Sequence, residues 1–266
     1  MLGLVTYNLA RGWDLDTLLE RCGATGFDAV ELRVDHAHGV GPHLDPAARR
    51  QVRRRFDASV VRLVGLGTTC EYHALEAETV AENVRRTEAW IDLAADLVCP
   101  GVKVRPNGHQ EAAGVPRQHT LRQIGRALAH CAAYGERRGV AVRLEMHGAV
   151  AEAEDIAAIV HAADHPALRV CWNCNPCDVR DGSVAAAFAR VCDRIGLVHI
   201  QELWNPAYPW AELFGLLAQC GYPGPCLAEI PESAEPVRLM RYYRALYAAL
   251  QPATRQGDHR GALAAG

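Results

Sequence analysis

The sequence lacks the features that mark membrane, secreted and polyanion-binding proteins. No run approaches the roughly 20 consecutive apolar residues that span a bilayer. No early segment joins a basic start to an apolar stretch and a small-residue cleavage site, because residues 2–10 already have the pattern of a strand. The formal net charge of −3 offers no general attraction to phosphate polymers. We therefore expect a cytoplasmic protein that binds neither membranes nor nucleic acid.

Cysteine, by contrast, is plentiful, and three of the ten cysteines follow one another at every third position. Cys171, Cys174 and Cys177 have the spacing of thiolates that gather a metal cluster. An extended backbone, however, points Cys171 and Cys174 to opposite faces, and no fourth cysteine follows at the usual spacing. Without a secretion signal, we expect reduced thiols, many of them in the core. The functional residues of this stretch are then Asn173 and Asn175.

Short β-like runs alternate with longer helix-like runs along the whole chain, as in a parallel sheet built from repeated βα units. The β-like runs lie at 2–7, 27–34, 60–68, 101–108, 140–148, 168–173, 197–202 and 225–230. The helix-like runs lie at 14–26, 45–59, 77–97, 119–139, 153–164, 183–196, 208–224 and 235–250. Eight of each predict a single-domain (β/α)8 TIM barrel over residues 1–250, with a disordered tail at 251–266. A doubly wound open sheet is the alternative.

Reactive side chains of such a barrel lie at the carboxyl ends of its strands. Strand alternation places Glu145 and His147 on one face of the fifth run, His199 and Gln201 on one face of the seventh, and Glu229 on the eighth. The same parity joins Cys171 and Asn173 of the sixth run to Asn175 just after it. We expect these polar side chains to converge on the barrel axis.

Two carboxylates in a partly dry pocket repel each other unless a proton or a cation lies between them. A divalent metal ion resolves the conflict between Glu145 and Glu229. Oxygen ligands with one imidazole favour Mn²⁺, Mg²⁺ or Co²⁺, although Zn²⁺ also accepts such ligands. The sequence therefore predicts a divalent metal ion as cofactor.

The runs RLEMHG, CWNCNP, VHIQEL and CLAEI resemble the xylose isomerase-like TIM-barrel superfamily of sugar phosphate isomerases and epimerases. That superfamily also contains inosose dehydratases and an endonuclease branch, and the resemblance runs from about residue 2 to residue 250. In it, Glu, Asp, His and Glu on the last four strands hold one divalent metal ion. The resemblance implies Glu145, Asn173, His199 and Glu229 as ligands. Asn replaces the expected Asp at position 173, but an amide oxygen remains a ligand for a hard cation.

Three further runs, ELRVDHAHG, TTCEYHA and KVRPNG, resemble a subgroup of the same superfamily. This resemblance implies a substrate site at the pocket mouth made of Arg33, His36, His38, Glu71, His73, Lys103, Arg105 and Asn107. We add Asn175 and Gln201, which strand alternation places on the same faces as Asn173 and His199. Guanidinium and ammonium groups suit phosphate or carboxylate, and imidazoles and amides suit hydroxyls. We expect a hydroxyl-rich or anionic small carbohydrate as the ligand.

The resemblance implies proton transfer next to a carbonyl through an enediolate, with Glu145 and Glu229 as the acid and base. A dehydratase or lyase acting on a keto sugar or keto inositol, with His147 or His199 as the acid, is the alternative. An endonuclease would need further ligands and a basic groove, which the slightly acidic balance does not favour. A barrel that binds a sugar without turning it over is the remaining alternative.

Overall fold

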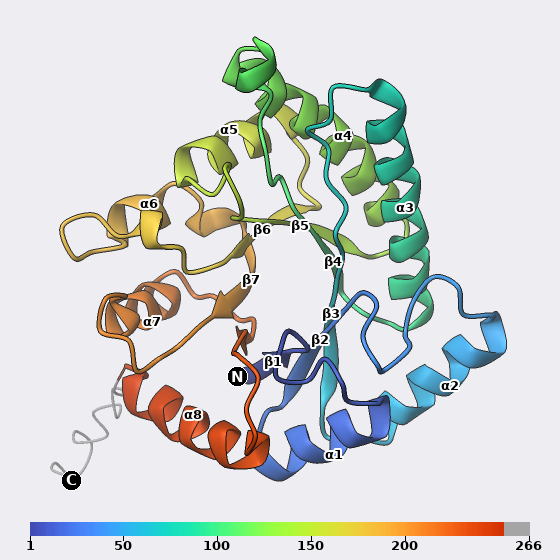
Figure 1. Ribbon diagram of the computed structural model, residues 1–266, viewed down its shortest axis with the longest axis vertical. Helices are drawn as coiled ribbons and strands as arrows, with labels where there is room; N and C mark the ends of the chain where they lie inside the picture. The colour runs from blue at the N-terminus through green and yellow to red at the C-terminus, as the bar shows by residue number, and fades with distance from the viewer. Residues whose placement is uncertain (253–266) are drawn as a thin grey trace, which may run out of the picture.

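Eight parallel strands close into a barrel in chain order, with the last strand paired to the first. The structure is a computed structural model that describes residues 1–252. Figure 1 views the molecule along the barrel, whose strands form a ring inside the helices. The strands are β1 (Leu2–Val5), β2 (Ala29–Arg33), β3 (Arg62–Gly67), β4 (Gly101–Val104), β5 (Ala141–Glu145), β6 (Leu168–Trp172), β7 (Ile195–Ile200) and β8 (Cys226–Ala228). The predicted single-domain TIM barrel is confirmed.

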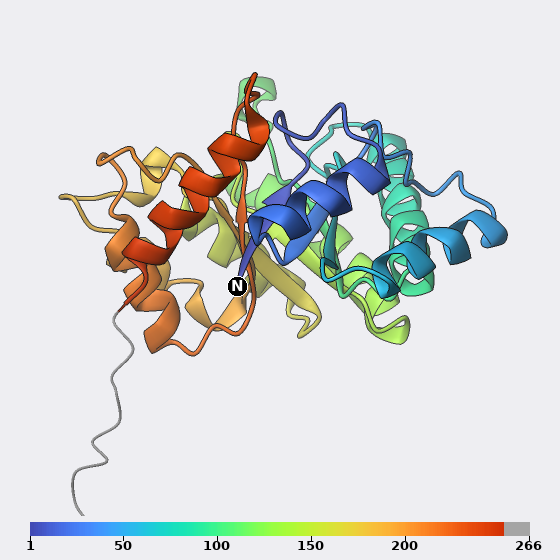
Figure 2. The same ribbon diagram turned by 90° about the horizontal axis from the view of Figure 1, so that it is seen from below.

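A ring of helices covers the outside of the barrel, as the side view in Figure 2 also shows. The α-helices are α1 (Leu15–Thr25), α2 (Pro46–Asp57), α3 (Ala77–Asp96), α4 (Arg117–Arg137), α5 (Ala153–Ala163), α6 (Ala185–Ala189), α7 (Trp210–Gln219) and α8 (Pro236–Leu250). Three 3-10 turns, η1 (Glu111–Ala113), η2 (Pro176–Asp178) and η3 (Cys192–Arg194), lie in the connections. None of the helices within residues 1–252 is long and apolar enough to cross a membrane. Most of the predicted tail lies outside the described residues.

Local sequence signals set the ends of the first two helices. The Asp14 carboxylate accepts a hydrogen bond from the Thr17 N–H at the start of α1, and Asp45 caps α2 in the same way before Pro46. Helix α1 ends at Gly26, whose φ of 72° suits a residue without a Cβ.

The helix expected over residues 183–196 is largely absent. Helix α6 covers only Ala185–Ala189, and the chain then passes through η3 into β7. Ile195 pairs with Val170 of β6, so the sheet takes residues that a longer helix would need. Strand pairing therefore overrides the helical periodicity of this segment.

The barrel interior is divided into an apolar layer and a charged layer. Val5, Ala29, Cys171, Leu197 and Leu227 form a small buried cluster of their own inside the strands. The next inward-facing positions toward the carboxyl ends carry Glu31, Lys103, Glu145, His199 and Glu229. The apolar layer thus lies directly beneath the polar side chains, and we call it the floor of the barrel.

Candidate active site

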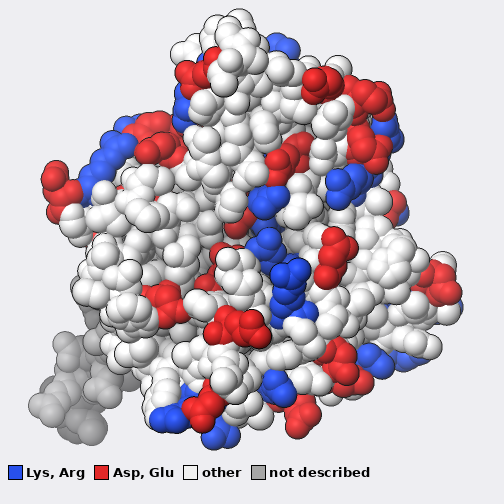
Figure 3. All heavy atoms as spheres, in the orientation of Figure 1, with Lys and Arg blue, Asp and Glu red and all other residues white. Residues whose placement is uncertain are grey.

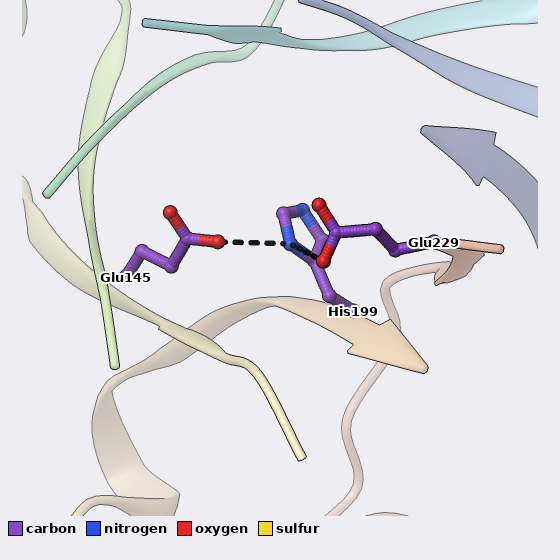
Figure 4. Close-up of side chains that lie close together, drawn as sticks. All are labelled: Glu145, His199 and Glu229. Carbon is purple, nitrogen blue, oxygen red and sulfur yellow. Dashed lines mark ion pairs between the residues drawn. The ribbon is translucent and has the colours of Figure 1, made fainter. Parts of the chain in front are cut away.

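Glu145, His199 and Glu229 converge at the carboxyl ends of β5, β7 and β8, as predicted. Nδ1 of His199 is 3.4 Å from Oε1 of Glu145 and 4.0 Å from Oε2 of Glu229. Figure 4 shows the imidazole between the two carboxylates. One ligand atom from each residue lies within 4.8 Å of the other two. In residues 1–252 this is the one group of three or more His, Cys, Asp or Glu side chains close enough to hold an ion.

The cysteines do not form such a group. Cys171 lies in the apolar layer of the barrel, Cys174 is buried with a φ of 52°, and Cys177 is partly exposed. All ten are free thiols, as expected. Within the described residues, these three thiols are therefore not gathered around a common point as a metal cluster would require.

Glu145 is fully buried and is held by the ammonium of Lys103. Nζ of Lys103 is 2.6 Å from Oε2 of Glu145, and neither side chain is more than 2% exposed. Burial alone would raise the pKa of Glu145, but Lys103 and then His199 outweigh it and lower that pKa. Glu145 is therefore a carboxylate with one oxygen paired and the other facing His199.

Glu31 of β2 is a site residue that the sequence analysis missed. Its side chain is fully buried, and Oε1 lies 3.4 Å from Nε2 of His199, on the side of the ring opposite Glu145. Gly65 and Gly67 of β3 make room for it, since a Cβ on Gly67 would lie 2.6 Å from Oε1. Glu31 is an acidic residue between Val30 and Leu32, on the same strand face as Arg33. This placement is the sequence feature that indicates a site residue.

His199 stands among these carboxylates with its two ring nitrogens facing different partners. Burial would lower the pKa of His199, but Cys171, Glu31 and Glu145 outweigh it and raise that pKa well above its ordinary value. A proton on the ring would balance the negative charge of the surrounding carboxylates. A divalent ion at Nδ1 would balance the same charge. Binding of an ion at this nitrogen would therefore release a proton.

Asn173, Asn175 and Gln201 lie around the ends of β6 and β7, but their side chains make different hydrogen bonds. Oδ1 of Asn173 is buried and has no hydrogen-bond partner within the described residues. The side-chain amide of Gln201 donates to the backbone carbonyl of Asn173 at 3.4 Å. The Asn175 amide donates to the Met146 carbonyl at 2.7 Å, and Asn175 also caps η2, so its side chain is occupied within the protein.

Arg33 and the two histidines after β2 surround the opposite side of the mouth. Nη1 of Arg33 is 3.0 Å from Oε1 of Glu229. Nδ1 of His36 is 3.2 Å from the Thr6 hydroxyl. His38 contacts the Arg33 carbonyl through Nε2 at 2.9 Å, and Nδ1 accepts the Val40 N–H. Burial lowers the pKa of His38 to about 4, so this ring is neutral. It stabilises the loop after β2 through these two contacts.

A second polar group is centred on Glu71 after β3. Its Oε1 accepts hydrogen bonds from Arg105 at 2.6 Å and from the Asn107 amide at 2.7 Å. The side-chain oxygen Oδ1 of Asn107 is in turn 2.6 Å from Nδ1 of His147. Nδ1 of His73 is 3.8 Å from the other Glu71 oxygen. Glu71, Arg105, Asn107 and His147 thus form one hydrogen-bonded network at the β3–β5 side of the mouth, and His73 lies beside it.

Charges of both signs meet over the centre of the barrel. Figure 3 shows basic side chains that follow one another through the middle of the face seen in Figure 1, with acidic side chains beside them. Burial lowers the pKa of His147, and Lys103 and Arg105 add to the effect. The imidazole of His147 is therefore neutral, and it enters the network as a hydrogen-bonding group.

The donor set fits a divalent metal ion. Glu145 and Glu229 supply anionic oxygens, His199 supplies an imidazole, and the partnerless Oδ1 of Asn173 is a neutral oxygen of the kind that hard cations accept. The contacts of 3.4 and 4.0 Å around Nδ1 of His199 are close to the spacing of ligands that share an ion at roughly 2.1 Å. The three residues can reach a common ion with small side-chain movements.

The fold and the site together define a (β/α)8 barrel with a candidate metal centre at the carboxyl ends of its strands. Residues 19–246 match the family model described as xylose isomerase-like TIM barrel. The chain therefore belongs to the xylose isomerase-like TIM barrel family, as its motifs predicted. A search of curated proteins found no match.

Several solved structures share this fold over nearly the whole chain. D-psicose 3-epimerase from Clostridium cellulolyticum H10, solved with D-tagatose, is 13% identical with a TM-score of 0.79, covering 94% of this chain and 99% of that one. An L-ribulose 3-epimerase is 17% identical with a TM-score of 0.77, covering 94% and 93%. The IOLI protein, solved with a bound zinc atom, is 14% identical with a TM-score of 0.72, covering 94% and 95%.

Proposed function

We propose that this protein is a divalent-metal-dependent isomerase or epimerase of a sugar, sugar phosphate or cyclitol. The observation that carries the proposal is the convergence of Glu145, His199 and Glu229 within 4.8 Å at the mouth of the barrel. The solved sugar epimerases with the same fold support it. The ion would be held by these three residues and by Asn173. When bound, it would supply electrophilic stabilisation of negative charge on the substrate's carbonyl oxygen.

The chain's own residues divide the remaining work. Glu145 and Glu229 reach the centre from different strands, so that one carboxylate can remove a proton next to the carbonyl and the other can return it. Lys103 holds Glu145 and Arg33 holds Glu229, which fixes both carboxylates in direction. Isomerisation and epimerisation then differ in the carbon to which the proton returns.

The rim residues suit a hydroxyl-rich or anionic substrate. Arg33 and Arg105 each have side chains that are 18% exposed, and each is bound to a carboxylate that sets its direction. His36, His73, Asn107 and His147 offer hydrogen-bonding atoms on both sides of the mouth. Lys103 differs from the others because its side chain has no exposed surface, so it lies below the position where a sugar would rest.

The decisive experiment follows hydrogen exchange in D₂O. Purified protein is stripped with a chelator, reloaded with Mn²⁺, Mg²⁺, Co²⁺ or Zn²⁺, and incubated with ketoses, ketose phosphates and keto inositols while NMR detects deuterium beside the carbonyl. Exchange with isomer formation is expected in the loaded protein and not in Glu229→Gln. Loss of water from the substrate would indicate the dehydratase instead. Metal binding without exchange on any of these compounds would point to a non-catalytic barrel.

The geometry favours the isomerase over the endonuclease, and the D₂O experiment separates the isomerase from the dehydratase. An endonuclease needs a basic groove, whereas charges of both signs mix over this mouth (Figure 3). Cleavage of an abasic-site duplex by the loaded protein would overturn this ranking.

A further inference from the structure

The one lysine of the chain lies inside the candidate site. Lysine occurs once among the 28 lysine and arginine residues of the sequence, so arginine serves at every other cationic position. Lys103 projects from β4 into the barrel, beside Gly67 in the strand register, and its side chain has no exposed surface. An ammonium is a compact point charge, whereas a guanidinium is planar and needs several partners. The position thus holds the smaller of the two cations, at full burial.

Lys103 shares a carboxylate with the candidate metal centre. Oε2 of Glu145 is 2.6 Å from Nζ of Lys103, while Oε1 faces Nδ1 of His199 at 3.4 Å. An ion at the centre would use Oε1, so two cations would sit on the two oxygens of one carboxylate. Lys103, Glu145 and His199 are each at most 2% exposed, so water screens little of the repulsion between those cations.

We propose that Lys103 is a positioning residue that shares Glu145 with the metal ion. It directs Oε1 toward the ion, weakens the affinity for that ion, and leaves the occupied centre one charge more positive than its ligands alone would make it. The added charge lies beside the point where a substrate gains negative charge when it loses a proton. The inference rests on the proposed function, because it uses the same metal centre.

The test is a metal titration that needs no sugar. Mn²⁺ is titrated by calorimetry into the chelator-treated protein and into Lys103→Gln, which keeps a hydrogen-bond donor near Glu145 but removes the charge. We expect Lys103→Gln to bind Mn²⁺ at least tenfold more tightly, and Mn²⁺ to raise its Tm more than that of the parent. Lys103→Met, which also removes the donor, should show the same direction. A merely structural lysine would give weaker binding in both variants.

Arg143→Gln is the matched control. Arg143 also projects into the barrel, from β5, but its guanidinium donates to the Val64 carbonyl at 2.6 Å and it is not paired with Glu145. Its removal should leave the Mn²⁺ affinity within about threefold. A variant that is unstable without metal is purified in Mn²⁺ and measured by competition with a chelator of known affinity.

Three results would overturn the inference. Equal or weaker Mn²⁺ binding by Lys103→Gln would refute it and leave the proposed function standing. An equal gain in Arg143→Gln would show that the effect is general charge and not a shared carboxylate. Failure of both the parent and Lys103→Gln to bind Mn²⁺, Mg²⁺, Co²⁺ or Zn²⁺ would overturn the metal centre itself, and the inference with it.

Discussion

Oε1 of Glu31 lies 3.4 Å from Nε2 of His199, while Nδ1 of the same ring faces Glu145. An acceptor on the Nε2 side favours the tautomer that carries its proton there, and this leaves Nδ1 free for a metal ion. We therefore expect Glu31 to favour the tautomer that leaves Nδ1 of His199 free, once the two groups close the 3.4 Å gap between them.

Removal of this acceptor should weaken metal binding. For Glu31→Leu we expect a loss of about 10- to 100-fold in Mn²⁺ affinity, in the range that carboxylates behind ligating histidines contribute. Glu31→Gln should lose less, because its amide oxygen can still accept from Nε2. Glu71→Leu is the control, since Glu71 is bound to Arg105 and Asn107 at the rim. Equal affinity in Glu31→Leu and the parent would show that the contact does not hold the ring.

The space around Glu31 depends on a glycine of β3. A Cβ added at Gly67 would lie 2.6 Å from Oε1 and 3.2 Å from Cδ of Glu31. Gly67→Ala should therefore push the carboxylate against His199 and lower the free energy of unfolding by about 1–3 kcal/mol. Gly215→Ala in α7 is the control, because open space surrounds it and the change should not destabilise the protein. Urea unfolding of both variants measures the difference.

A carboxylate at position 173, directly after β6, should tighten metal binding. Oδ1 of Asn173 is buried without a hydrogen-bond partner among the described residues, so Asn173→Asp would add a negative charge in a poorly screened position. The gain is up to about 4 kcal/mol at an effective dielectric near 20, for charges roughly 4 Å apart. Asn175→Asp adds the same charge where the side chain already serves the Met146 carbonyl, and it should tighten binding less. An Asn173→Asp variant with unchanged metal affinity would argue against Asn173 as a ligand.

Asp178 is not one of the candidate metal ligands, and its raised pKa predicts that the stability of the protein depends on pH. Burial raises the pKa of Asp178 to about 7, and it outweighs the hydrogen bonds from the Asn175 N–H and the Tyr208 hydroxyl. An unfolded chain releases this proton near pH 4. The folded protein thus binds one proton more between about pH 4 and pH 7, and its free energy of unfolding should fall as the pH rises through that window.

Asp178→Asn should remove this slope. The variant keeps an oxygen for the Asn175 N–H, so near pH 4 it should match the parent. At pH 8 it should be more stable by up to about 4 kcal/mol, at about 1.4 kcal/mol for each tenfold change in proton affinity. Chemical unfolding of the two proteins between pH 4 and pH 8 measures the difference. A gap that stays constant with pH would contradict the assignment to Asp178.

Much of the barrel and of its mouth could be predicted from the chain alone. Alternation within each strand placed Glu145, His199 and Glu229 inward, and their position near the strand ends brought them together. Contacts between strands could not be predicted in the same way. The pairing of Lys103 with Glu145 depends on the β4–β5 register, in which Lys103 lies opposite Arg143.

Two misses have a physical reason. Glu31 lies in the middle of an apolar strand, where its role becomes visible only once Gly65 and Gly67 are known to lie beside it. Helix α6 was predicted too long because Ile195 fits a helical pattern as well as a strand, and the sheet decides between them. Both errors concern partners far apart in the sequence, which local patterns do not report.

The apolar floor of the barrel lies beneath the buried carboxylates, toward the amino-terminal side of the strands. Val5, Cys171, Leu197 and Leu227 are fully buried and separate Glu31, Glu145 and His199 from the amino-terminal end of the strands. In an isomerase built on this plan, a hydrogen taken from the sugar would have the bound sugar between itself and bulk water. The other carboxylate would return a proton of its own, so the product would carry solvent hydrogen to the extent that this carboxylate had exchanged with water through the mouth.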